Sequence, residues 1–321
     1  MPPIEKKHKL SAFSDTEIIR LLASLIDFQD KSPDVSLEGD KEIVHLVDKL
    51  KDALSHAKYY PFSSATLETL ERAGIVRVVK RSPLDPYDID DPTTLAKHAA
   101  RYRAMLAEGA FLSADNFDGL FNTIVRHVST ITDAGSRLLV DAFLLRVAAM
   151  EDQGLLLIFP EYMVPITQLS GPDDTLAVAG KLDYLLVLIS EDQKNAAVSF
   201  LKNPRDPVEE GAKGFAIVQA KPTLYPILSD AIPQAVLEVA AFAKKQKKML
   251  MNGVVTNGLE WMFFSFTPGP DGVGGTFERS RQVSASSPEL RAVITGVLKD
   301  MIAGTSTVVR LPAVPSTQET A

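Results

Sequence analysis

The feature that most constrains the fold is a pair of short apolar runs in the second half of the chain, each bordered by polar residues. The first runs from Asp183 to Ile189 and the second from Gly214 to Lys221. Both are rich in Val, Ile, Leu and aromatic residues, which predicts two β-strands. A polar connection, roughly 190–213, separates them, so we expect the strands to pair as an antiparallel hairpin.

An antiparallel pairing brings the polar ends of the two runs together. The start of the first strand lies beside the end of the second, so we expect Asp183 close to Gln219 and Lys221. Because side chains alternate along a strand, residues 219 and 221 point to the same face. A carboxylate, an amide oxygen and an ammonium group at one sheet edge can hold a hard divalent cation and orient a water molecule against a phosphate.

The remaining pattern predicts helices in the first half and a mixture of strands and helices in the second. Apolar spacing and turn signals predict helices near residues 14–25, 43–54, 64–73, 93–107, 115–131, 134–151 and 287–303. A further helix is predicted to begin with a cap at Ser229 or Asp230 and carries apolar residues between Ala235 and Phe242. Strands are predicted near 75–79, 155–159, 253–256, 260–266 and 277–283, with Asn257-Gly258 as a hairpin turn. The helix at 134–151 is apolar almost all round, so we place it in the core against a sheet.

These elements predict an α/β (α+β) fold with a mixed sheet flanked by helices. We divide the chain into a mainly helical N-terminal region at 1–132, an α/β core at 133–304 and a disordered tail at 305–321. The segment 82–92 contains three prolines and is predicted to be a linker or surface loop, because proline disrupts helices.

Composition excludes several kinds of site. The 321 residues include no cysteine, which rules out disulfides, thiolate metal sites and cysteine nucleophiles. All five histidines precede the two strands and lack metal-binding spacing, which disfavours a histidine-based nuclease or a zinc site. A net charge of −7 counts against strong non-specific DNA binding, although a nuclease needs only a local basic surface.

The chain also lacks the usual signals for a membrane or for secretion. No apolar run approaches transmembrane length, and the first residues have no apolar secretion core. We therefore expect a soluble intracellular protein, cytoplasmic or nuclear, without a membrane partner.

Three pieces of this pattern, in order along the chain, resemble the PD-(D/E)xK nuclease superfamily, which has the restriction-endonuclease-like fold. They are Gly180-Lys-Leu-Asp183-Tyr, Val218-Gln-Ala-Lys221, and Gln234 in the following helix. The later segment at 253–261 is similar to a hairpin of uncharacterised fungal members. The resemblance covers roughly residues 135–285. It departs at Gln219, where most members have an acidic residue and Mrr-type endonucleases also have Gln.

The resemblance implies a role for each matching residue. Asp183 and Gln219 would contact Mg²⁺ or Mn²⁺, and the main-chain carbonyl of Ala220 would complete the protein ligands. Lys221 would orient the attacking water and stabilise charge on the phosphate, and Gln234 would belong to the same catalytic group. Gln219 in place of an acid removes one negative charge from a site that must attract a cation.

Several residues have competing interpretations. An acidic residue of the preceding helix or loop often assists the metal ligands, and Glu151 and Glu161 are both candidates. Asp173 follows Pro172 and matches the letters of the motif, but Gly-Pro-Asp-Asp is most simply a turn. Glu238 lies one helical turn after Gln234, and we expect a surface role for it. The lysines at 244–248 are predicted to form a solvated helix end, with a phosphate contact as the alternative.

The function predicted from these residues is Mg²⁺- or Mn²⁺-dependent hydrolysis of nucleic-acid phosphodiester bonds, with DNA favoured. A first alternative is an inactive nuclease-like fold that serves as a protein or nucleic-acid interaction module. Gln219 and the acidic charge balance favour that alternative. A second is a helical scaffold in which the motif is accidental. A protein partner or a second copy of the chain would bind through the helical N-terminal half.

Overall fold

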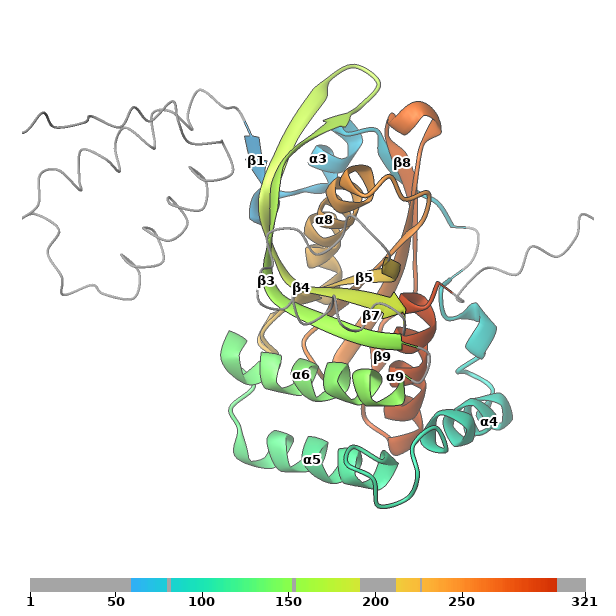
Figure 1. Cartoon of the computed structure of the whole chain (residues 1–321). Coiled ribbons are helices and arrows are strands. Elements are labelled where there is room, and N and C mark those ends of the chain that lie inside the picture. Colours follow the sequence, from blue (N-terminus) through green and yellow to red (C-terminus); the bar gives the residue numbers. More distant parts are fainter. Residues whose placement is uncertain (1–58, 80–81, 152–153, 191–211, 226, 305–321) are drawn as a thin grey trace, which may run out of the picture.

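A computed structural model describes residues 59–79, 82–151, 154–190, 212–225 and 227–304. Within these ranges nine strands form one mixed sheet with helices on both faces (Figure 1). The strand order is β1-β4-β5-β6-β7-β8-β2, with β3 paired to β4 and β9 paired to β7. The predicted mixed sheet flanked by helices is confirmed. The predictions for residues 1–58, for most of the 190–213 connection and for the tail lie outside the described residues.

A long hairpin of β3 (Gly154–Ser170) and β4 (Thr175–Ser190) forms one end of the sheet and curves over it (Figure 1). β3 extends well beyond the predicted 155–159 and includes Pro160 and Pro165. Among the described residues β3 pairs with β4 and makes one further bridge, from Ser170 to Val273. Pro160 and Pro165 therefore lie where the other side of β3 is an edge, and they interrupt no second ladder.

The predicted antiparallel pair is confirmed. β4 pairs with β5 (Ala212–Ala220) in a register that places Tyr184 opposite Val218. The chain then crosses through α8 (Ile232–Lys245) to β6 (Met251–Thr256), which is parallel to β5. β6 turns at Asn257-Gly258 into antiparallel β7 (Glu260–Pro268), as the sequence predicts.

Two short strands replace the single one predicted at 277–283. β8 (Gly275–Arg279) pairs with the second half of β7, whereas β9 (Val283–Ser284) pairs with its start. Between them the main-chain N–H of Ser280 still donates to the Phe263 carbonyl of β7 at 2.7 Å. The Ser280 hydroxyl accepts a hydrogen bond from the Phe263 amide at 3.0 Å and donates one to the Arg281 carbonyl.

Helices cover both faces of the sheet (Figure 1). The short α3 (Leu67–Arg72) and α8 lie on one face, and α6 (Asp133–Met150) and α9 (Pro288–Ile302) lie on the other. Outside these, α5 (Ala114–His127) packs on α6, and α4 (Pro92–Arg103) packs on α9. Alternate residues of β5 point into these two cores, which explains its unbroken apolar run.

Residues before 132 contribute strands as well as helices. β1 (Tyr59–Pro61) pairs parallel to β4, and β2 (Ile75–Arg77) pairs parallel to β8 at an edge of the sheet. Segment 82–92 contains one 3₁₀ turn, Asp85–Tyr87, and α4 begins at Pro92, in agreement with the loop prediction. The domain boundary at residue 132 stays a prediction.

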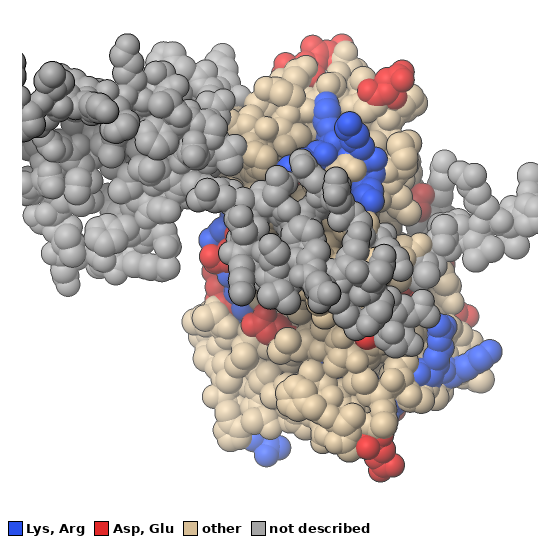
Figure 2. Space-filling view, viewed as in Figure 1, with Lys and Arg blue, Asp and Glu red and all other residues tan. Residues whose placement is uncertain are grey.

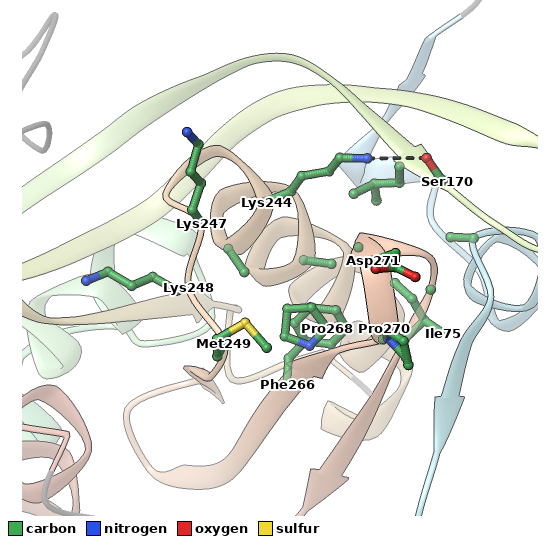
Figure 3. Close-up of a pocket in the computed structure, with 17 residues that line it drawn as sticks. Ile75, Ser170, Lys244, Lys247, Lys248, Met249, Phe266, Pro268, Pro270 and Asp271 are labelled. Carbon is green, nitrogen blue, oxygen red and sulfur yellow. Dashed lines mark hydrogen bonds between the residues drawn. The ribbon is translucent and has the colours of Figure 1, made fainter.

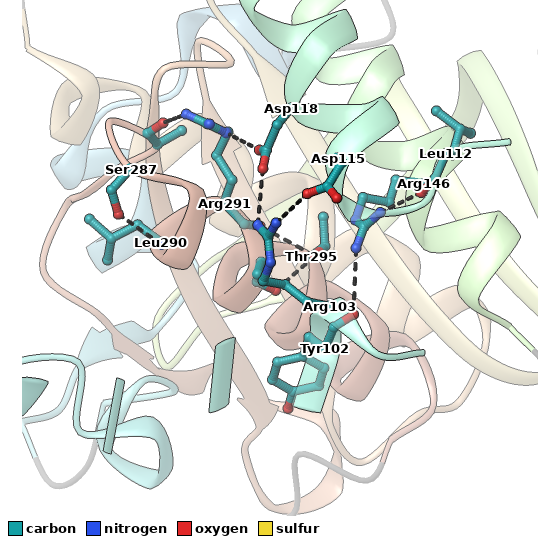
Figure 4. A network of polar contacts seen from close by, with 12 residues as sticks. Tyr102, Arg103, Leu112, Asp115, Asp118, Arg146, Ser287, Leu290, Arg291 and Thr295 are labelled. Carbon is teal, nitrogen blue, oxygen red and sulfur yellow. Dashed lines mark hydrogen bonds and ion pairs between the residues drawn. The ribbon is translucent and has the colours of Figure 1, made fainter. Parts of the chain in front are cut away.

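An ionic network joins three helices from distant parts of the chain (Figure 4). Asp118 of α5 accepts from Arg103 of α4 at 3.0 Å and from Arg291 of α9 at 2.7 Å. Arg103 also pairs with the exposed Asp115. Arg291 is almost fully buried, so its charge depends on Asp118.

None of the helices in the described ranges is long and apolar enough to cross a membrane. Figure 2 shows Lys and Arg side chains gathered on the upper part of this face and again near its lower right edge.

Candidate functional site

Asp183 and Gln219 lie side by side on β4 and β5. Asp183 precedes Tyr184, and Gln219 follows Val218. Because Tyr184 and Val218 are paired in the antiparallel ladder, Asp183 and Gln219 lie opposite each other. Oδ2 of Asp183 accepts hydrogen bonds from the amide nitrogen of Gln219 and from the main-chain N–H of Ala220, the latter at 2.8 Å. Both side chains are buried.

Lys221 and Gln234 continue this contact as one hydrogen-bonded chain. Nζ of Lys221 donates to Oε1 of Gln234 at 3.0 Å, and Nε2 of Gln234 donates to Oε1 of Gln219 at 3.3 Å. Because an ammonium group can only donate, Lys221 sets the orientation of the Gln234 amide and, through it, that of Gln219. The structure therefore joins Asp183, Gln219, Lys221 and Gln234, as the sequence predicts.

The local fold explains why these four residues meet. β5 ends at Ala220, and the Lys221 main chain donates to the Thr256 carbonyl of parallel β6 at 2.8 Å. Pro222 follows and has no N–H with which to continue the ladder. Gln234 belongs to the first turn of α8, after Pro233, and its hydrogen bond to Gln219 shows that this turn lies close to the end of β5.

Arg137 of α6 binds the other oxygen of Asp183. Its Nη2 lies 2.5 Å from Oδ1 of Asp183, and its Nη1 lies 3.2 Å from Oε1 of Glu161. Glu161 also pairs with Lys181 at 3.1 Å, which is the main cause of its lowered pKa. Burial raises the pKa of Asp183, and the charge of Arg137 acts in the opposite direction. The Arg137 guanidinium group thus links Glu161 to Asp183.

The backbone at Glu161 is strained. Its φ of 55° lies in the left-handed region, which is unusual for a residue other than glycine. Its neighbours Pro160 and Tyr162 pair with Tyr184 and Leu182, so Glu161 stands opposite Asp183 across the β3–β4 ladder. Strain of this kind often accompanies a functional site, because the surrounding structure must hold it in place.

Glu238 is fully buried, and the expectation of a surface role is wrong. Gln234 donates to its Oε1 at 2.9 Å, while its Oε2 has no hydrogen-bond partner among the described residues. Burial raises the pKa of Glu238 well above its ordinary value, and the charge of Asp183 acts in the same direction. The reason is the packing of α8, whose residues 235–243 are covered by the sheet.

Two other acidic candidates lie elsewhere. Glu151 caps the C-terminal end of α6 and pairs with Lys299 of α9 at 3.1 Å. Asp173 is exposed in the turn between β3 and β4. Of the two assisting acids proposed from the sequence, only Glu161 adjoins Asp183.

The oxygen atoms at this site suit a hard divalent cation in type. They are the Asp183 carboxylate, the Ala220 carbonyl and, after rotation of its amide, Oε1 of Gln219. Oε2 of Glu238, which has no hydrogen-bond partner among the described residues, is a further oxygen of this group. Asp183 also already binds one cation, the Arg137 guanidinium. Within the described ranges no group of three or more His, Cys, Asp or Glu side chains could hold a metal. A divalent ion would therefore depend on neutral oxygens and would compete with Arg137.

Sequence reasoning missed Arg137 and underestimated Glu238. Arg137 stands near the start of the largely apolar helix at 134–151, and a cation in such a helix is a weak signal for a buried partner. Glu238 follows Gln234 by one helical turn, which indicates a shared face. Neither signal identifies the partner.

No protein-family model matches the chain, and no curated protein is significantly similar to it. The geometry of the site and the resemblance in its motifs are therefore the basis for a functional proposal.

Proposed function

We propose that this chain is a nuclease-like protein with a restriction-endonuclease-like core that hydrolyses phosphodiester bonds of nucleic acid, with DNA as the favoured substrate and Mg²⁺ or Mn²⁺ as cofactor. The observation that carries the proposal is the hydrogen-bonded chain from Lys221 through Gln234 and Gln219 to Asp183. The order α6-β3-β4-β5-α8-β6 around it is compatible with that core.

In this proposal some residues of the site bind a cation and others contact the phosphate. Asp183, the Ala220 carbonyl and Gln219 would hold the metal, which would supply an acidified bound water and stabilise negative charge. Glu161 would act indirectly, by offsetting part of the positive charge of the Arg137 guanidinium that it shares with Asp183. Lys221 would orient the water and place its positive charge beside the phosphate, and Gln234 keeps the Lys221 ammonium in position.

Cleavage of plasmid and single-stranded DNA with Mg²⁺, Mn²⁺ or EDTA tests the proposal. We expect slow cleavage with metal and none with EDTA. Lys221→Ala should reduce the rate about 10²-fold or more, because it removes a positioned charge at the reacting phosphate. Asp183→Ala should abolish activity. Lys97→Ala, which changes an exposed lysine of α4, is the matched control and should leave the rate unchanged.

A second candidate function is an inactive interaction module, and one observation favours it. Both oxygens of Asp183 are already bound by protein donors, so the carboxylate needs no metal to be satisfied. Calorimetry with Mn²⁺ distinguishes the two functions. Binding that is lost in Asp183→Asn supports the enzyme, whereas no detectable binding, with equal trace cleavage by wild type and Lys221→Ala, establishes the inactive module.

A further inference from the structure

A cavity of about 540 Å³ lies at the C-terminal end of α8 (Figure 3). Its walls come from α8 and the turn after it, from the ends of β3 and β7, and from the turn that joins β7 to β8. The volume is within the range of small-molecule sites in proteins.

The interior of the cavity is apolar and its rim is basic. Its inner surface is formed by buried side chains, Ile75, Leu169, Ala240, Ala243 and Phe266. Lys244, Lys247 and Lys248 stand on the rim, together with one carboxylate, Asp271. The charged groups around the opening are therefore mainly positive.

Lys244 is the cation best placed to meet a ligand. It is exposed, and Figure 3 shows its side chain extended across the cavity towards Ser170, whose hydroxyl lies 3.3 Å from Nζ. Lys247 and Lys248 point away from the cavity in the same view, and Lys248 lies over the Phe215 ring at 4.9 Å. The Lys244 ammonium group can pair with one anionic group, and the Asp271 carboxylate on the rim would repel a second. The opening therefore suits a ligand with a single negative charge.

This cavity is separate from the candidate nuclease site. Gln234 and Glu238 belong to the N-terminal half of α8, whereas the cavity takes its helical residues from Ala240 onwards. Met249 at the rim is 73% exposed, so an apolar ligand would also cover a side chain that now faces solvent.

We propose that this cavity binds an aliphatic monocarboxylate, with the hydrocarbon chain among the apolar walls and the carboxylate paired with Lys244. The apolar interior supplies affinity in proportion to chain length, and Lys244 supplies the preference for an anion over a neutral molecule of the same shape.

Calorimetry with decanoate, octanoate and decanol on the full chain tests this inference. Each added methylene should tighten binding about fourfold while the cavity has room, so decanoate should bind more tightly than octanoate. Lys244→Ala should weaken decanoate binding at least fivefold and leave decanol unchanged. Lys245→Ala is the control, because Lys245 does not line the cavity.

A second pair of variants changes the exposed Met249 on the rim and tests the charge preference independently of Lys244. Met249→Glu places a negative charge at the rim and should weaken decanoate binding, whereas Met249→Gln, of the same shape, should not. The inference is overturned if decanoate shows no binding at millimolar concentration, or if it and decanol bind alike to every variant. Sedimentation that shows a dimer disrupted by Met249→Glu, with no decanoate binding, would assign the cavity to a second copy of the chain.

Discussion

At the scale of single residues, the site depends on Gln219 being an amide. Its nitrogen donates to Asp183 and its oxygen accepts from Gln234, so one side chain meets an acceptor on one side and a donor on the other. A carboxylate has no donor to offer Asp183. The departure from the usual acidic residue therefore has a local structural consequence.

We predict that Gln219→Glu lowers the free energy of unfolding by about 1–3 kcal/mol in EDTA, because it replaces a buried donor with a second carboxylate. Mn²⁺ should restore part of this loss if the two carboxylates share a cation. Urea denaturation with EDTA and with Mn²⁺ measures both effects. Gln168→Glu makes the same change at an exposed position of β3 and should have little effect. Equal stability of the two variants in EDTA would contradict the contact with Asp183.

Glu238 provides a pH-dependent prediction at the same scale. Its folded-state pKa is raised by burial, so the folded protein retains a proton that the unfolded chain releases above about pH 4.3. Wild-type stability should therefore fall as pH rises from that value towards the folded-state pKa. Glu238→Gln removes this titration. The free energy of unfolding of the variant should therefore rise relative to that of the wild type between pH 5 and pH 7.

Thermal unfolding of both proteins in EDTA across this range measures the difference. A constant difference at every pH would show that Glu238 is already ionised in the folded protein.

At the scale of elements, glycine and proline decide where strands and helices turn. α8 begins without the side-chain cap predicted at Ser229 or Asp230, because a 3₁₀ turn, Leu228–Ala231, leads directly into it. At the β6–β7 hairpin, Gly258 has a φ of 84°, and a Cβ there would lie 2.5 Å from the Cβ of Leu139 on α6. Position 258 therefore requires glycine for two reasons, its left-handed backbone and its closeness to Leu139 of α6.

We predict that Gly258→Ala destabilises the protein more than Gly272→Ala. Both positions have a left-handed backbone, which costs alanine about 1–2 kcal/mol. Only Gly258 adds the clash with Leu139, since nothing lies within 4 Å of a Cβ at Gly272. Chemical denaturation of the two variants isolates the steric contribution. Equal losses of unfolding free energy in the two variants would show that a side chain at residue 258 does not clash with α6.

At the scale of the whole molecule, side-chain contacts between helices, as well as strand pairing, connect the first half of the chain to the second. Asp118 of α5 holds Arg103 of α4 and Arg291 of α9 (Figure 4). Tyr87 and Tyr102 reach the same α9 through hydrogen bonds to Asp300 at 2.9 and 2.7 Å. These contacts join residues on both sides of the boundary predicted at 132.

We predict that Asp118→Ala costs about 3–5 kcal/mol of unfolding free energy, because it leaves Arg291 buried without its carboxylate. Asp115→Ala removes the exposed partner of Arg103 and should cost under about 1 kcal/mol. Urea denaturation compares the two variants. Equal losses would mean that the burial of Arg291 does not depend on this ion pair.

The sequence by itself determined the two apolar strands, their antiparallel pairing, the turn at Asn257-Gly258 and the meeting of Asp183 with Gln219 and Lys221. These follow from strand periodicity and from the geometry of neighbouring strands, both of which act over short stretches of chain. Only the tertiary structure decided that Arg137 binds Asp183, that Glu238 is buried and that β1 and β2 join the sheet. Helical periodicity groups residues on one face, but whether that face is covered, and by which partner, depends on how distant segments pack.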